Sequence, residues 1–348
     1  MFQYILRRIL IMIPTLLGVT VITFGIINLA PGSPIEQKIQ QLRFGGAGGG
    51  EGGGGSAAMG ANGKDSAVSE EVIEALRTQY GFDKPLYMRY FIWLKNLATL
   101  DFGESFTYEE PVIDVITSKL PVSLQFGIIS LILTYLISVP LGIFKAIHNS
   151  SKFDYVSSFI IFAMYSIPGF MLAILLIVFF AGGQFFDWFP VGDLYSDNYE
   201  MLGLGAKILD RVHHFILPLI SYMIGHFTIL TMLQKNSLLD EIKKDYIRTA
   251  RAKGLSEKKV YLKHALRNAL IPIVTGIGGF LTVFFAGSLL IENIFNLDGM
   301  GQLGYKSILE RDYNVIMGLT FIQSILMLVG NLISDLAYIV VDPRIDFS

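Results

Sequence analysis

The chain has 348 residues, of which 52% are hydrophobic and 16% are charged, and its mean hydropathy is +0.54. Soluble proteins carry more charge than this, so the composition indicates an integral membrane protein rather than one or two soluble domains. The formal net charge of −2 gives no support to nucleic-acid binding, and the lack of cysteine excludes disulfides and thiolate metal sites.

Six intervals without a charged residue follow one another along the chain. Each is longer than the ~20 residues that a helix needs to cross the hydrocarbon layer. We therefore expect an all-α integral membrane protein with six transmembrane helices, within residues 9–35, 120–144, 155–186, 212–234, 268–291 and 313–334. An even number of crossings places both termini on one side, and Arg7 and Arg8 beside the first interval predict that this side is the cytoplasm.

Three regions are expected along the chain. Residues 1–35 hold the N-terminal region and the first helix, residues 36–120 form a long external loop, and residues 121–348 hold the other five helices. Within the loop, residues 45–63 are mostly glycine, which is typical of a flexible linker. Helical patterns return at 69–81 and at 86–100. The second is rich in aromatic residues, which suits a helix in the membrane interface as well as a small packed subdomain.

The segment 237–270 is charged and lies between two apolar intervals. Ser237, with Asp240 three residues later, predicts a capping box that opens a helix. Gly254 predicts the end of this helix, because glycine readily adopts the left-handed conformation that closes one, and Ser256 predicts the start of the next. The result is a cytoplasmic hairpin rich in Lys and Arg. On composition alone, a solvated basic loop that only fixes the topology explains it equally well.

Two runs in this segment carry a family resemblance. Tyr246–Ser256 and His264–Pro272 resemble the coupling segment of ABC importer permeases, in which the short helix before the glycine docks in a groove of the ATPase subunit. The chain has Arg248-Thr249-Ala250 where the broad family has Glu-Ala-Ala, a departure typical of the dipeptide, oligopeptide and nickel branch. The resemblance places Ala250 on the docking face. It implies a role in ATPase coupling for Tyr246, Arg248, Ala250, Arg251, Lys253, Gly254 and Leu255.

Tyr80–Pro85 and Asp101–Ser105 resemble the external region of the B-type subunit of peptide permeases. The family's C-terminal signature is resembled by four later runs, namely Glu292–Gly301, Arg311–Tyr313, Asn331–Asp335 and Asp342–Asp346. The resemblance thus extends over nearly the whole chain except the glycine-rich linker. The insertion at 36–66 and the ending Asp342–Phe347 favour the branch that imports oligopeptides and peptide-antibiotic conjugates.

The resemblance implies a permease subunit of an ATP-driven peptide importer, with the type I ABC importer fold and no catalysis of its own. The chain itself would bind no cofactor and no metal, because ATP and Mg would be held by partner ATPase subunits. The implied partners are a second, different permease subunit, two ATPase domains, an extracytoplasmic peptide-binding protein and membrane lipid, but no nucleic acid. The implied location is the bacterial inner membrane.

Candidate residues of a substrate path are chosen by position only, as modest polar groups inside the apolar intervals. They are Gln125, Ser130, Tyr165, Ser166, Thr275 and Thr282. Tyr165 and Ser166 stand beside Pro168, which frees a backbone carbonyl, although ordinary packing of small residues between helices explains them as well.

Two other polar features favour structural explanations. Asp335, near the cytoplasmic end of the last interval, is expected to pair with Arg344, Arg7 or Arg8. His213 and His214 lack a third ligand at the spacing of a metal site, and we expect them at the mouth of the fourth helix.

Other functions remain open as alternatives. A nickel or glutathione permease would belong to the same branch. A secondary transporter usually has inverted repeats and charges in mid-membrane, whereas here the charges stand at the ends of the apolar intervals and in one hairpin. An intramembrane enzyme would need a nucleophile, base or metal constellation, and the sequence contains no such motif.

Overall fold

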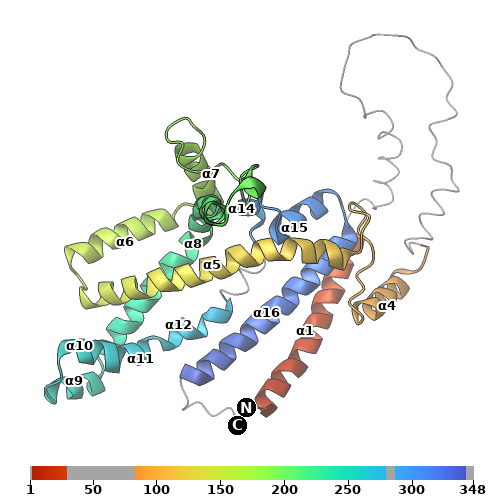
Figure 1. The fold of residues 1–348 in the computed structure, drawn as a ribbon. Coiled ribbons are helices and arrows are strands. Elements are labelled where there is room, and N and C mark those ends of the chain that lie inside the picture. The colour runs from red at the N-terminus through yellow and green to blue at the C-terminus, as the bar shows by residue number, and fades with distance from the viewer. Residues whose placement is uncertain (1, 30–82, 280–286, 342–348) are drawn as a thin grey trace, which may run out of the picture. The chain divides into compact units, whose positions relative to one another are not determined.

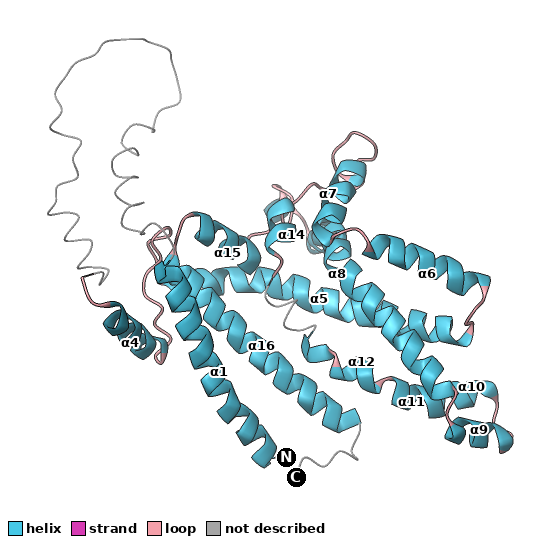
Figure 2. Ribbon diagram, turned by 180° about the vertical axis from the view of Figure 1, so that it is seen from behind, coloured by secondary structure: helices cyan, strands magenta, loops and turns pink. Residues whose placement is uncertain are grey.

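The computed structural model describes residues 2–29, 83–279 and 287–341, and these are predominantly helical (Figure 1, Figure 2). This part of the chain contains no strand, only one isolated antiparallel bridge between Glu104 and Pro111. The expected all-α class is confirmed for these residues. The main helices are α1 (Phe2–Leu29), α4 (Leu86–Leu97), α5 (Val112–Ile147), α6 (Lys152–Tyr165), α7 (Gly169–Phe180), α8 (Leu204–Ile242), α9 (Asp245–Ala252), α10 (Glu257–Lys259), α11 (Leu266–Ala269), α12 (Ile271–Thr275), α14 (Leu289–Ile294), α15 (Met300–Leu309) and α16 (Tyr313–Val341).

Four helices are long and apolar enough to cross a membrane, namely α1, α5, α8 and α16. They match the first, second, fourth and sixth apolar intervals. The third interval is divided into α6 and α7, which meet at an angle of 98° around Ser166 to Pro168 and form at most one further span. Where it is described, the fifth interval holds the short helices α11, α12 and α14 and a helical stretch at 277–279, and residues 280–286 lie outside the described part. Six crossings therefore stay a prediction.

The chain divides into two compact units. The first comprises Met1–Leu16, Ile116–Tyr305 and Phe321–Ser348, and the second comprises Leu17–Val115 and Lys306–Thr320. The charged hairpin and the candidate substrate-path residues belong to the first unit. The expected helix at 69–81 lies outside the described residues.

In the second unit, the aromatic helix α4 packs on the C-terminal half of α1. The ring of Phe24 meets Tyr90 edge to face at 5.3 Å and stacks on Trp93 at 6.0 Å between centroids. Tyr87 and Phe91 are mostly exposed, although the Phe91 ring also meets Tyr90 edge to face. The helix therefore has a packed aromatic face and an exposed aromatic face, so both interpretations of its composition stay compatible with the structure.

In the first unit, α5 and α8 pack around an aromatic core. Phe126 of α5 is fully buried and stacks on Phe215 and Tyr222 of α8, with ring centroids 4.3 and 5.9 Å apart. The helices α7 and α14 pack on α8 and complete the core. Burial of such large aromatic side chains gives this helix pair a fixed register, which positions the residues at both of its ends.

Candidate functional site

The charged hairpin begins later in the chain than the sequence predicts. Ser237 is not a helix cap, because it lies inside α8, which continues to Ile242. Its hydroxyl donates to the backbone carbonyl of Ala269 at 2.9 Å. The predicted capping box at Ser237 was wrong. Leu238 is fully buried, and its packing in the hairpin keeps this turn as part of α8. The next helix, α9, starts at Asp245.

The turn of the hairpin lies at Gly254, as predicted. Its φ is +76°, in the left-handed region that a residue with a β-carbon enters only with strain. The N–H of Gly254 donates to the carbonyl of Arg251 at 2.9 Å, and the N–H of Leu255 donates to that of Ala250 at 3.4 Å. These two bonds form a Schellman motif, which closes the end of α9. Ser256 then precedes α10, so the predicted second start is also confirmed.

The inner face of α9 packs on the chain's own apolar residues. Ile247 and Ala250 are buried in one cluster with Leu238, Val260 and Ala265. Ala250 therefore packs inside the hairpin in this chain, and the place on the docking face that the resemblance implies for it stays a prediction. Positions three apart share a helix face, and the face that carries Ile247 is turned inward.

The outer face of α9 and its turn are basic. Arg248 and Lys253 are exposed, and Arg248 makes only a surface pair with Asp245 at 3.2 Å. Arg251 donates to both carboxylate oxygens of Glu257, at 2.9 and 3.2 Å, and so joins the two sides of the turn. This hydrogen-bonded guanidinium lowers the pKa of the Glu257 carboxyl. The outward surface is thus positively charged and held in a defined shape.

Tyr246 ties α9 to both neighbouring helices. Its hydroxyl donates to a carboxylate oxygen of Glu241 at 2.5 Å and accepts a hydrogen bond from Asn268 at 3.1 Å. Burial and the bond to Glu241 raise the pKa of Tyr246 to about 12, so the phenol remains a donor at neutral pH. Tyr246, Ala250, Arg251 and the half-buried Leu255 therefore shape the hairpin, whereas Arg248, Lys253 and Gly254 face outward.

A buried ion-pair network joins α5, α6 and α8 beside the hairpin. Both carboxylate oxygens of Asp154 accept from Lys235, at 2.7 and 2.8 Å, and one lies 3.1 Å from the Lys145 ammonium. Lys145 also donates to the hydroxyls of Ser157 and Ser158, at 2.6 and 2.8 Å. All three charged side chains are buried, so a single carboxylate balances two ammonium groups.

This network borders the hydrophobic cluster of the hairpin. Ala146, next to Lys145, and Leu238, three residues after Lys235, both belong to that cluster. Sequence reasoning missed the network. A signal was available, because each of these three charges stands directly at the end of an apolar interval. All three of these ends were predicted to lie on the cytoplasmic side of the membrane.

At the other end of α5, a second buried carboxylate holds the loop after α14. Glu292 accepts hydrogen bonds from the hydroxyls of Ser123 and Tyr222, at 2.8 and 3.0 Å, and from the N–H of Gln302 at 3.0 Å. A β-carbon at Gly299 would lie 2.5 Å from the Glu292 carboxylate, so only glycine fits there. The presence of Glu292 and Gly299 in the run Glu292–Gly301 is thus explained by the close approach of the backbone to this carboxylate.

Comparison with known proteins places this geometry in a family. A family model described as "Binding-protein-dependent transport system inner membrane component" matches residues 138–347, which include the hairpin, the buried network and the Glu292 loop. The chain belongs to this family.

Similar permeases align with the chain along its whole length. The peptidoglycan transport system permease protein YejB of Agrobacterium fabrum is 49% identical, with 100% of this chain and 99% of the relative aligned. The inner membrane ABC transporter permease protein YejB of Escherichia coli O157:H7 is 45% identical over the same shares. The oligopeptide transport system permease protein AppB of Bacillus subtilis is 37% identical, with 100% of both chains aligned. The chain is therefore a membrane transport component rather than an enzyme.

Of the predicted path residues, the five that the structure describes do not lie together in one site. Gln125 lines a cavity between α5 and α8, whereas Ser130 is buried on another face of α5. Tyr165 and Ser166 are exposed at the break between α6 and α7, and the carbonyl of Thr275 accepts a hydrogen bond from Ser334. Thr282 lies outside the described residues.

A more polar cavity of about 440 Å³ lies beside the α6–α7 break of the permease. Its lining includes Gly169 from the start of α7, Tyr222 and His226 from α8, and Ser288 before α14. Sequence reasoning noted Pro168 but predicted one continuous helix here, and it missed Tyr222 and His226, because no local pattern indicates which face of α8 turns toward α7.

The two histidines and the aspartate that the sequence analysis singled out have structural partners. His213 and His214 contact backbone carbonyls, at 2.5 and 2.9 Å. Within the described ranges, no group of His, Cys, Asp or Glu side chains has the arrangement of a metal site. Arg8 pairs with Asp335 at 3.1 Å, which confirms the predicted pairing.

Proposed function

We propose that this permease is the B-type subunit of an ATP-driven importer that moves peptides, either oligopeptides or peptide conjugates, into the cytoplasm. The observation that carries this proposal is end-to-end similarity to permeases whose names refer to peptidoglycan and oligopeptide transport systems. The chemistry common to these names is the peptide. The polar cavity beside the α6–α7 break supports the proposal, because a peptide backbone needs hydrogen-bond partners along its path.

The proposed coupling element is the hairpin from α9 to α11. Its shape is set by the Gly254 turn and by the Tyr246 and Arg251 hydrogen bonds, while its exposed basic side chains remain free to meet another protein. A hairpin with a fixed shape and exposed basic side chains can dock on an ATPase subunit, and that subunit would itself bind ATP and Mg. The permease then needs no cofactor of its own.

Transport of peptides can be tested with the full permease complex in proteoliposomes. We expect ATP-dependent uptake of labelled di- to oligopeptides that requires the binding protein. Exclusive uptake of nickel or of glutathione would assign the chain to a sister branch. Peptide uptake that continued without ATP would instead indicate a secondary transporter.

We further propose that the permease works beside a second, different permease subunit, two ATPase domains and an extracytoplasmic binding protein. This proposal rests on the resemblance of the chain to the B-type subunit of peptide permeases. Co-purification with a different permease is the expected result. A stable and active complex with two identical copies of this chain would contradict it.

The proposed topology has six crossings in the inner membrane and both termini in the cytoplasm. In this arrangement residues 1–35 hold the first crossing, residues 36–120 the external loop and residues 121–348 the permease core. Because the chain has no cysteine, single cysteines report topology directly. Ser150 and Ser256 are exposed, and so is Glu310, whereas Ser307 is buried and unsuitable.

We expect Glu310→Cys to react with an impermeant maleimide in intact cells, and Ser150→Cys and Ser256→Cys to react only after permeabilisation. Each variant serves as the control of the others, because all three positions are exposed in the folded chain. Reaction of Ser256→Cys in intact cells would place the hairpin outside and refute the topology.

A further inference from the structure

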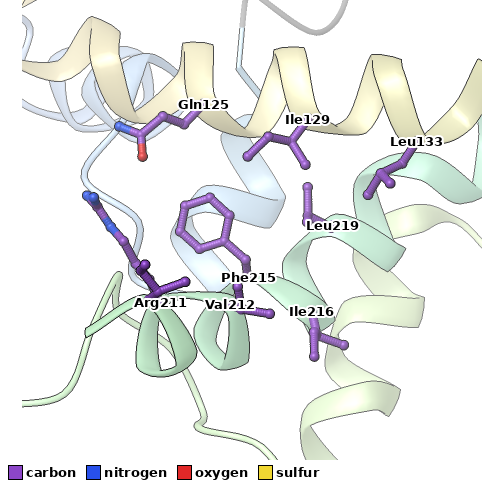
Figure 3. Close-up of a pocket in the computed structure, with 9 residues that line it drawn as sticks. Gln125, Ile129, Leu133, Arg211, Val212, Phe215, Ile216 and Leu219 are labelled. Atoms are coloured by element: carbon purple, nitrogen blue, oxygen red, sulfur yellow. The ribbon is translucent and has the colours of Figure 1, made fainter. Parts of the chain in front are cut away.

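A cavity of about 490 Å³ lies between α5 and α8, in the first unit (Figure 3). From α5 it is lined by Gln125, Ile129 and Leu133, which follow one another at every fourth position. From α8 it is lined in the same way by Arg211, Phe215 and Leu219. Both series run in the same direction, so Gln125 and Arg211 lie at one end of the cavity and Leu133 and Leu219 at the other, as Figure 3 shows.

The two ends differ in chemistry. Nearly all the lining is aliphatic or aromatic, and only the Gln125 amide and the Arg211 guanidinium are polar. The Nε of Arg211 is buried without a hydrogen-bond partner, and no acidic side chain in the described residues pairs with this guanidinium. The carboxylate of the neighbouring Asp210 instead accepts hydrogen bonds from the N–H and the hydroxyl of Ser196. Arg211 as a whole is partly exposed, but a guanidinium with a buried, unpartnered Nε and no acidic partner among the described residues favours an anionic ligand at this end.

The sequence indicates where this end lies in the bilayer. Arg211 is the last charged residue before the charge-free interval 212–234, and Gln125 follows closely after the start of the interval 120–144. Both polar groups therefore stand at the level of the lipid headgroups. Eight residues of helix separate Gln125 from Leu133, so the groove extends roughly 12 Å from that level into the hydrocarbon layer.

The apolar part of the groove fits an acyl chain better than a peptide. A peptide backbone buried there would find no hydrogen-bond partners beyond the polar end, which is unfavourable. The rim residues Ile208 and Val212 are exposed and apolar, as are Ile132 and Leu136 further along α5. In a membrane, such a surface meets lipid chains unless another subunit covers it.

We propose that this groove is a binding site for an anionic phospholipid, with one acyl chain between α5 and α8 and the phosphate held by Arg211 and Gln125. An arginine offers two parallel N–H donors to phosphate oxygens, and the amide of Gln125 adds another. The site is independent of the peptide that the transporter carries. It would stabilise the packing of α5 on α8 by filling the groove.

The test uses the whole transporter complex, stripped of lipid and titrated with phosphatidylglycerol in native mass spectrometry. We expect Arg211→Gln to weaken the binding of the added phosphatidylglycerol about tenfold, because a charge-assisted contact with its phosphate is lost. The matched control is Lys207→Gln, one turn earlier on α8, whose ammonium already pairs with Glu200 and does not line the groove. We expect this control to bind like the parent protein, and Arg211→Lys to recover part of the affinity.

A second pair of variants tests the acyl-chain site. Ile129→Trp fills the groove, whereas Ile132→Trp adds the same bulk on the exposed side of α5. We expect only Ile129→Trp to lower phosphatidylglycerol binding. Equal lipid binding by Arg211→Gln, Ile129→Trp and the parent complex would overturn the proposal, and so would a cross-link from Ile129→Cys to the second permease. Peptide uptake by the same complexes is measured separately, so loss of lipid binding is distinguishable from a wrong assignment of the substrate.

Discussion

Replacing Asp154 with alanine is expected to lower the free energy of unfolding of the permease by about 3–5 kcal/mol. The carboxylate is the only acid bonded to the buried ammonium groups of Lys145 and Lys235 in the described structure. Its removal leaves two positive charges buried without a counter-charge, and their desolvation is then uncompensated. The measurement is chemical unfolding of the purified complex in detergent.

Two further variants make this prediction specific. Glu200→Ala removes an exposed acid that pairs with Lys207, and we expect a change below about 1 kcal/mol. Asp154→Leu combined with Lys145→Met and Lys235→Met removes all three charges, and we expect it to recover much of the lost stability because no unpaired charge remains. Equal stability of Asp154→Ala and the parent protein would show that the network contributes nothing.

Gly254→Val is expected to abolish substrate-stimulated ATP hydrolysis and peptide uptake while the protein still inserts in the membrane. The φ of +76° costs a β-branched residue more than the roughly 1–2 kcal/mol that most L-residues incur in the left-handed region. The Schellman bonds of Gly254 and Leu255 would then distort, and the exposed end of α9 would change direction. ATP hydrolysis and uptake in proteoliposomes measure the effect.

Gly254→Asn is the matched control. Asparagine is similar in size to valine but enters the left-handed region more readily, and a β-carbon at this position meets no atom of the described residues within 4 Å apart from its chain neighbours. We expect partial activity if backbone geometry matters and none if the docking surface leaves no room for any side chain. Normal transport by both variants would contradict the coupling role, and the hairpin would then be a basic loop that only fixes the topology. Ala250→Glu is no substitute for this test, because Ala250 is buried in the hairpin itself.

The amino-acid sequence by itself determined the features that rest on local rules. Apolar intervals indicated the membrane-spanning helices α1, α5, α8 and α16, because their length is set by the bilayer. Gly254 marked the turn, because the left-handed conformation of one residue is a local property. The pairing of Asp335 with one of three nearby arginines also followed, because a charge near a membrane needs a partner, and the structure selects Arg8.

Only the tertiary structure decided which side of each helix is buried. Ser237 remained helical and Ala250 turned inward because residues distant in sequence, Val260 and Ala265, complete the cluster around Leu238. The Asp154 network joins three helices, with Lys235 more than 80 positions away, and no periodic pattern encodes such a contact. Helical period and backbone conformation depend on neighbouring residues, whereas burial depends on the packing of distant helices. For that reason the sequence located the hairpin, and the structure assigned its residues to an inner and an outer face.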